Sequence, residues 1–115
     1  MEIRTNVNFT VIDSMNTLTS AEDIKNMVDT EIKVIGILIY DTVDKSTGEL
    51  KTVGAIKSDD ETIYGFTSAT MIECAEMMAG AFTDSNAKSI TVIPFTKQSN
   101  NKRTFYQFKI VDIEK

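Results

Sequence analysis

The sequence EIKVIGILIYD, residues 31–41, gives the strongest strand signal in the chain and determines the fold predicted for it. The apolar residues at positions 32, 34, 38 and 40 alternate onto one face of an extended strand, and those at 35, 37 and 39 fall on the other. Apolar residues on both faces predict burial on both sides. Gly36, in the middle of the run, predicts a bulge or a sharp bend. A long, bent, doubly buried strand is what a small barrel needs to wrap around its own core.

Two further strands and a helix are predicted after this strand. A polar turn at 44–49 precedes an alternating strand over Leu50–Lys57, and a second turn at 58–61 precedes a short strand over Thr62–Thr67. Ser68 is a suitable N-cap for a helix from Ala69 to about Phe82, whose apolar residues recur at helical spacing.

The chain closes with a predicted hairpin over residues 90–113, ITVIPFTKQSNNKRTFYQFKIVDI, whose polar turn lies at 98–101. In its second strand Tyr106, Phe108 and Ile110 alternate onto an all-apolar face, which we expect to lie in the core. The opposite face carries Arg103, Phe105, Gln107 and Lys109.

The first thirty residues are predicted to be less regular. Residues 1–18 are expected to form an arm or a short edge strand. The run Thr19-Ser20-Ala21-Glu22 fits a capping box and predicts a short helix from Ala21 to about Val28. The expected organisation is therefore an N-terminal segment, residues 1–18, followed by one domain, residues 19–115.

The order of these elements is three meander strands, a helix and a closing hairpin. This is the order of an OB-fold, a five-stranded Greek-key barrel that binds oligomers. We expect a mainly β protein of this type, with a helix between strands three and four and a short N-terminal helix. An open α+β sheet with the helix on one face has the same elements, but Gly36 and the two-faced first strand favour the barrel.

Composition excludes several classes of function. The chain has 115 residues, a net charge of -5, one cysteine and no histidine. Disulfide frameworks, multi-cysteine zinc sites and mechanisms that need a histidine base are thereby excluded within one chain. No apolar run is long enough to span a membrane, and the N-terminus does not resemble a signal peptide, so we expect a soluble cytoplasmic protein.

The charge is unevenly distributed, and the basic end of the chain carries the candidate binding residues. Residues 1–31 hold four more acids than bases, and residues 86–115 hold four more bases than acids. Cations interleaved with aromatic rings suit a single-stranded nucleic acid, since cations meet phosphates and rings stack on bases. The predicted site residues, each with a structural alternative in the core or on a solvated face, are Lys51, Lys57, Tyr64, Phe66, Lys97, Lys102, Arg103 and Phe105.

No metal or other cofactor is expected. The carboxylates of Asp59-Asp60-Glu61 are explained by turn formation. Cys74 is expected to be a structural thiol, because the chain supplies no histidine to activate it.

The chain resembles the small single-stranded DNA-binding proteins of bacteriophages. The resemblance is carried by EIKVIGILIYDTVDKSTGELKTVGAIKSDDETIYGFTS, residues 31–68, by the helix SATMIECAEMMAG, residues 68–80, and by Thr104-Phe105 in the closing hairpin. It covers roughly residues 20–113. The chain differs from bacterial-type proteins of this kind in ending with VDIEK rather than a long acidic tail, and it lacks tryptophan.

The resemblance implies an OB-fold protein that coats and protects single-stranded DNA during phage genome replication, in the host cytoplasm, without catalysis. Its implied partners are single-stranded DNA, phage replication proteins and further copies of itself along the strand. The alternative function is a non-enzymatic protein–protein interaction module, a phage adaptor or inhibitor, which the acidic surface suits. Exposure of Phe105, Tyr64 and Phe66 distinguishes the two, since buried rings cannot stack on bases.

Overall fold

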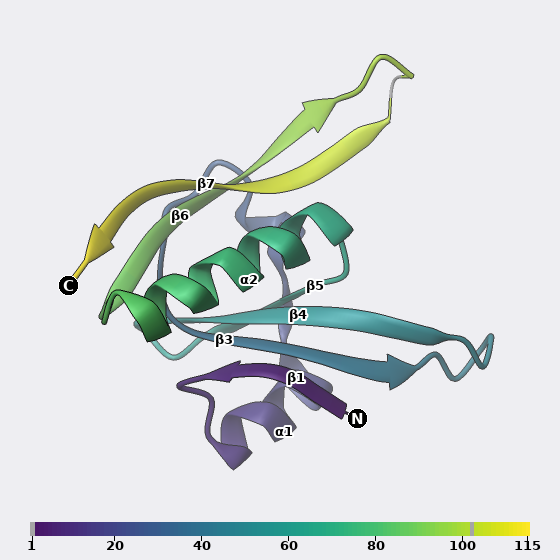
Figure 1. Ribbon diagram of the computed structural model, residues 1–115. Helices are drawn as coiled ribbons and strands as arrows, with labels where there is room; N and C mark the ends of the chain where they lie inside the picture. Colours follow the sequence, from purple (N-terminus) through teal and green to yellow (C-terminus); the bar gives the residue numbers. More distant parts are fainter. Residues whose placement is uncertain (1, 102) are drawn as a thin grey trace.

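A computed structural model describes residues 2–101 and 103–115 as a mainly β protein. Seven strands form one mixed sheet that curls into a half-barrel, with two α-helices and a short 3-10 helix (Figure 1). The elements are β1 Glu2–Val7, α1 Val11–Ser20, β2 Glu22–Asp23, η1 Ile24–Met27, β3 Ile32–Val43, β4 Leu50–Ser58, β5 Ile63–Phe66, α2 Ala69–Asp84, β6 Ser89–Gln98 and β7 Thr104–Glu114. The five predicted strands and the helix between the third and fourth are confirmed, and β1 and β2 extend the sheet.

Strand β3 is the centre of the sheet, because it has different neighbours along its length. The strand order is β2-β5-β4-β3-β6-β7. Residues Ile32–Val34 pair with β6, while residues 37–41 pair with β1. The change of neighbour occurs at Gly36, where the β3–β4 register also shifts. A Cβ at Gly36 would lie 2.9 Å from the Val7 carbonyl oxygen, so the close approach of β1 requires glycine.

Both faces of β3 are buried, as predicted. The irregularity between Val34 and Gly36, however, changes which residues before and after it lie on the same face. Val34, Ile37 and Ile39 belong to the main core beneath α2, whereas Leu38 and Tyr40 pack with Phe9 in a second cluster. The prediction that Val34 shares a face with Leu38 and Tyr40 is wrong, because strict alternation does not continue through the irregularity at Gly36.

The N-terminal segment differs most from the prediction. Strand β1 confirms an extended segment, but residues 11–20 form helix α1 instead of continuing the arm. Of the short helix predicted over 21–28, only the 3-10 turn η1 over Ile24–Met27 is present, because Glu22 and Asp23 form β2. The capping box is formed by Thr10 and Asp13: the Thr10 hydroxyl accepts from the Asp13 amide, and the Asp13 carboxylate accepts from the Thr10 amide, both at 3.0 Å. Thr19 and Ser20 lie in the last turn of α1, so they cannot cap a helix at Ala21.

Helix α2 packs against β7, β3, β1 and β4 and lies between the two hairpins (Figure 1). Its predicted N-cap is confirmed, since the Ser68 hydroxyl accepts from the Met71 amide. The same hydroxyl donates to the carbonyl of Tyr106 at 3.2 Å, which ties the start of α2 to the start of β7.

The closing hairpin is confirmed as β6 and β7. Phe108 is buried in the core, as predicted, but Ile110 is 40% exposed. The register of the hairpin shifts between Val92, which pairs with Ile110, and Thr91, which pairs with Asp112, so the alternation of β7 breaks there. In the described part of the chain β7 pairs only with β6 and β2 pairs only with β5, so the half-barrel stays open between β2 and β7.

Candidate nucleic-acid interface

A cleft of about 770 Å³ opens beside the unpaired edge of the half-barrel. Its walls come from the facing ends of β3 and β4, from β2 and η1, from the link between β5 and α2, and from the start of β7. Thr17 and Leu18, at the end of α1, complete its rim. Figure 1 shows the β3–β4 and β6–β7 hairpins projecting on either side of the N-terminal end of α2.

Phe105 presents an aromatic ring in this cleft. Its side chain is 42% exposed. Phe105 is the second residue of β7, close to the hairpin turn, and it pairs with Lys97 on β6. Its neighbour Tyr106 is half-buried and also lines the cleft, with the Nζ of Lys25 5.1 Å from the centroid of its ring. One free ring and one ring already contacted by a cation therefore lie side by side along β7.

Three lysines and two aspartates line the cleft. The lysines Lys25, Lys45 and Lys51 are exposed, whereas both carboxylates have local partners. Asp23 accepts from the Lys25 amide at 2.9 Å at the start of η1. Asp44 accepts from the hydroxyl and the amide of Ser46, and these bonds hold the pKa of Asp44 below its usual value. The cleft lining therefore holds three cations against two carboxylates, on a protein whose net charge is -5.

The hairpin beyond the cleft carries the other predicted cations. Lys97 and Arg103 are exposed, and the Ser99 amide donates to the Arg103 carbonyl at 2.9 Å to close the turn. Neither side chain lines the cleft itself: Lys97 lies on β6, directly opposite Phe105, and Arg103 immediately precedes β7. Lys102, also predicted in the site, lies outside the described residues.

Tyr64 and Phe66, the other two predicted stacking residues, are buried at 6% and 5% exposure. The Phe66 ring packs edge-on against Phe108, with centroids 5.2 Å apart and planes at 77°. It also covers Gly54 on the neighbouring strand β4, and it contributes to the floor of the cleft. Burial leaves neither ring with a free face, because each completes the main core.

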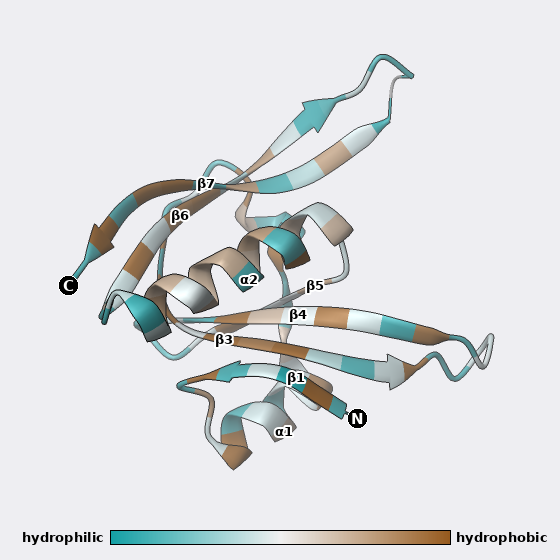
Figure 2. Ribbon diagram, in the orientation of Figure 1, coloured by the Kyte–Doolittle hydropathy of each residue, from teal (hydrophilic) through white to brown (hydrophobic). Residues whose placement is uncertain are grey.

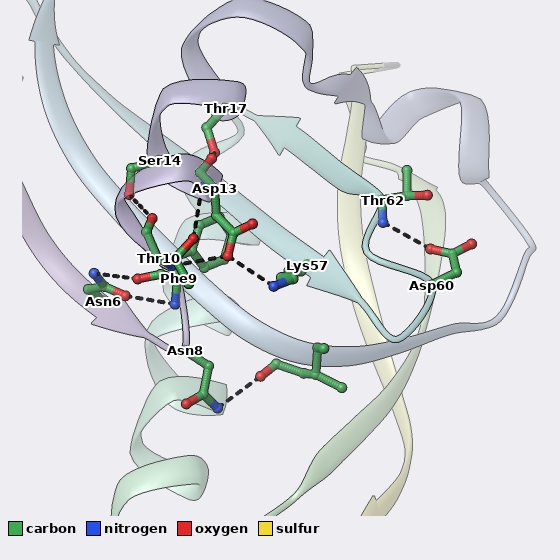
Figure 3. A network of polar contacts seen from close by, with 11 residues as sticks. Asn6, Asn8, Phe9, Thr10, Asp13, Ser14, Thr17, Lys57, Asp60 and Thr62 are labelled. Atoms are coloured by element: carbon green, nitrogen blue, oxygen red, sulfur yellow. Dashed lines mark hydrogen bonds and ion pairs between the residues drawn. The ribbon is translucent and has the colours of Figure 1, made fainter.

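Lys57, predicted to contact phosphate, is engaged elsewhere. Its Nζ lies 2.9 Å from a carboxylate oxygen of Asp13, and the two side chains are only 12% and 15% exposed (Figure 3). The pair joins β4 to α1 and is not part of the cleft lining. The sequence predicts an arm or edge strand for residues 1–18, so the ion pair between Asp13 and Lys57 was not expected.

Lys25, Lys45 and Tyr106 belong to the cleft but were not predicted there. Lys25 fell in a segment predicted to be helical, and Tyr106 was placed in the core by strand alternation. Lys45 lies in a polar turn, where a lysine is common and carries no signal of its own. Only the folded arrangement of η1, the β3–β4 hairpin and β7 brings these residues together.

The described residues, 2–101 and 103–115, contain no group of three or more His, Cys, Asp or Glu side chains placed to hold a metal ion. Neither of their helices is long and apolar enough to cross a membrane. Comparison of the chain with protein-family models, curated proteins and solved structures found no match.

Proposed function

We propose that this protein binds single-stranded DNA in the cleft and catalyses no reaction. One observation carries the proposal: an exposed ring, Phe105, stands in a cleft that three exposed lysines also line, on an acidic protein. A ring that stacks on any base, next to cations that meet phosphates, binds single strands with little sequence preference.

The connectivity supports an OB-type arrangement. Strands β3, β4 and β5 form a meander, α2 follows, and β6 returns to pair with the start of β3. OB-folds bind oligonucleotides on the face of their second and third strands, between the loop joining strands one and two and the loop joining strands four and five. In this chain those loops are the β3–β4 and β6–β7 turns, and the cleft lies between the hairpins they close. The correspondence is one of connectivity, because β7 and β5 are not paired.

The role we propose is coating and protection of single-stranded DNA during phage genome replication, in the cytoplasm of a host cell. Sequence-tolerant stacking suits a protein that must cover any stretch of a genome. Replication proteins of the phage are the further partners proposed.

Binding at a single site should be modest. A base stacked on Phe105 contributes ~1–3 kcal/mol. Each phosphate contact to a single strand adds about 0.7 to the log–log salt slope, so five cations (Lys25, Lys45, Lys51, Lys97 and Arg103) set a slope of about 3.5 if all of them are engaged.

The test is a titration of labelled oligo-dT, followed by fluorescence anisotropy at two salt concentrations. Phe105→Leu should weaken binding roughly tenfold, the loss of ~1.4 kcal/mol, with an unaltered salt slope. Lys51→Gln should lower the slope by about 0.7. Lys88→Gln, a matched change at an exposed lysine outside the cleft, should leave both quantities unchanged.

Two results would contradict the proposal. The first is the absence of saturable binding by the wild-type protein at low salt. The second is binding that Phe105→Leu and Lys51→Gln leave intact, which would locate the DNA site elsewhere.

The alternative function, a protein–protein interaction module, is favoured by a different observation: helix α1 exposes four large apolar side chains. Failure of DNA binding together with specific association through α1 would support it.

A further inference from the structure

Helix α1 is oriented with its apolar side toward solvent. Val11, Ile12, Met15 and Leu18 are 78%, 70%, 60% and 55% exposed, whereas Ser14 and Thr17 are buried at 8% and 7%. We call the four exposed residues the α1 stripe. A surface helix of a monomer normally directs its apolar side inward. Figure 2 shows the hydrophobic first turn of α1 at the outer end of the helix.

Polar contacts fix this orientation. Asp13 forms the capping box with Thr10 and pairs with Lys57 of β4. On the same side of the helix, the Ser14 and Thr17 hydroxyls donate to backbone carbonyls one turn earlier, at 3.1 Å and 2.8 Å (Figure 3). Rotating α1 to bury the stripe would break the Asp13–Lys57 pair, whereas the capping box and the two hydroxyl bonds lie within the helix and its cap and would persist. The outward stripe is therefore part of the folded structure.

The chemistry of the stripe defines its occupant. Asp13 is the only charged residue of α1, and it faces inward. A nucleic acid would find no cation on the helix. An amphipathic helix that binds an anionic membrane carries Lys or Arg on its polar face, and α1 has neither. The stripe fits another uncharged, apolar helix face.

We propose that this occupant is α1 of a second copy of the chain, in a two-fold symmetric contact. Val11, Met15 and Leu18 are spaced by four and three residues, the spacing of a helix–helix seam. In an isologous contact the same patch faces itself. Met15, central in the stripe, then lies near the two-fold axis and close to its own counterpart. The net charge of -5 on each chain does not oppose the contact locally, because the stripe itself is uncharged.

The size of the stripe predicts a weak association. A ten-residue helix is about 15 Å long and about 10–12 Å wide with its side chains. Its exposed face is therefore smaller than the ~800 Å² per partner of a standard interface. Leu18 belongs both to the stripe and to the rim of the cleft, so the contact would hold two clefts near each other. The self-association does not itself require DNA.

Sedimentation velocity of the full chain tests the proposal, over concentrations from about 10 µM to about 1 mM. The wild-type mass should rise from 12.8 kDa toward that of a dimer. Met15→Glu should remain a monomer throughout this range. Asn16→Glu adds the same charge at the next, equally solvent-facing residue of α1 but outside the stripe, and should dimerise like the wild type. Both substitutions are at exposed positions, so thermal unfolding should show little change in stability.

Cross-linking distinguishes a second copy from another partner. In a Cys74→Ala background, Met15→Cys should form an intermolecular disulfide under mild oxidation much faster than Asn16→Cys. A wild-type protein that is monomeric at every concentration overturns the proposal. So does a dimer that Met15→Glu leaves intact, because its contact would then lie elsewhere.

Discussion

Gly54 and Phe66 form a cross-strand pair whose perturbation we predict in detail. They lie directly opposite each other on β4 and β5, and the Phe66 ring rests on the bare backbone of Gly54. A Cβ added at Gly54 would lie 2.2, 2.7 and 2.9 Å from three ring carbons of Phe66. Phe66 cannot move away freely, since it is 5% exposed and packs against Phe108 on its other side. Gly54→Ala must therefore displace a ring of the main core.

The adjacent strand provides a matched control. A Cβ at Gly65 of β5 would meet its nearest neighbour, the Cβ of Ala21, at 3.7 Å, which is ordinary contact. Gly65→Ala should stabilise the protein by about 0.4–1 kcal/mol through the reduced entropy of the unfolded chain. Gly54→Ala gains the same term but adds the cost of overpacking, about 1–3 kcal/mol. The difference between the two variants isolates the clash, because the entropic gain cancels.

Urea unfolding followed by far-UV circular dichroism measures this difference. We expect Gly54→Ala to be less stable than Gly65→Ala by about 1–3 kcal/mol, or roughly 4 °C or more in Tm. Combining Gly54→Ala with Phe66→Leu should cost less than the sum of the single changes, with a coupling of at least about 0.5 kcal/mol. Equal stabilities for the two alanine variants would refute the reasoning. Additive costs in the double variant would refute the assignment to Phe66.

Two further predictions concern the contacts that hold α1. Lys57→Met should lower the free energy of unfolding, measured by urea unfolding, by about 1–2 kcal/mol, because it leaves the mostly buried carboxylate of Asp13 without its cation. The same substitution should not change the affinity for oligo-dT, measured by fluorescence anisotropy, because Lys57 lies outside the cleft. The Thr10 amide, chiefly, holds the folded-state pKa of Asp13 below its usual value of 3.8, so stability from the ionised carboxylate is complete above that value and is lost as the pH falls through the folded-state pKa. The difference in urea midpoint between the wild type and Asp13→Asn should accordingly be largest near about pH 7 and should shrink as the pH falls below 3.8; a difference that does not change with pH would contradict the role of the ionised carboxylate.

The sequence correctly predicted the elements that depend on patterns between residues close together in the chain. The two-faced run of β3, the hairpin of β6 and β7, and the N-cap of α2 at Ser68 all depend on neighbours a few residues apart, and each is confirmed. The face assignment on β3 failed at Gly36, although the bulge itself was predicted. A bulge changes which residues share a face, and its exact position depends on β1, a strand that sequence reasoning had not paired.

Helix α1 shows a more general limit. The apolar residues between positions 11 and 18 do have helical spacing. Such spacing shows that a helix would have an apolar side, but it does not show whether that side packs on the protein or faces solvent. Here the ion pair between Asp13 and Lys57 of β4 holds the polar side inward. The partner in that ion pair is 44 residues away, so no local pattern could indicate it.

Phe105 and Lys51, which both line the cleft, were predicted from the sequence, each from the alternation of its own strand. Phe105 alternates with core residues along β7, which is a local property, and its exposure follows from that alternation. Lys25 and Lys45 were not predicted; they come from η1 and the β3–β4 turn, and they join Lys51 because the half-barrel is open beside β7. An acidic chain can hold a cationic cleft only if its acids are engaged or lie elsewhere. Asp23 and Asp44 are engaged by backbone and hydroxyl donors, and Asp13 is paired with Lys57. Three lysines against two aspartates leave the cleft a small positive excess, and the proposed phosphate contacts depend on that excess.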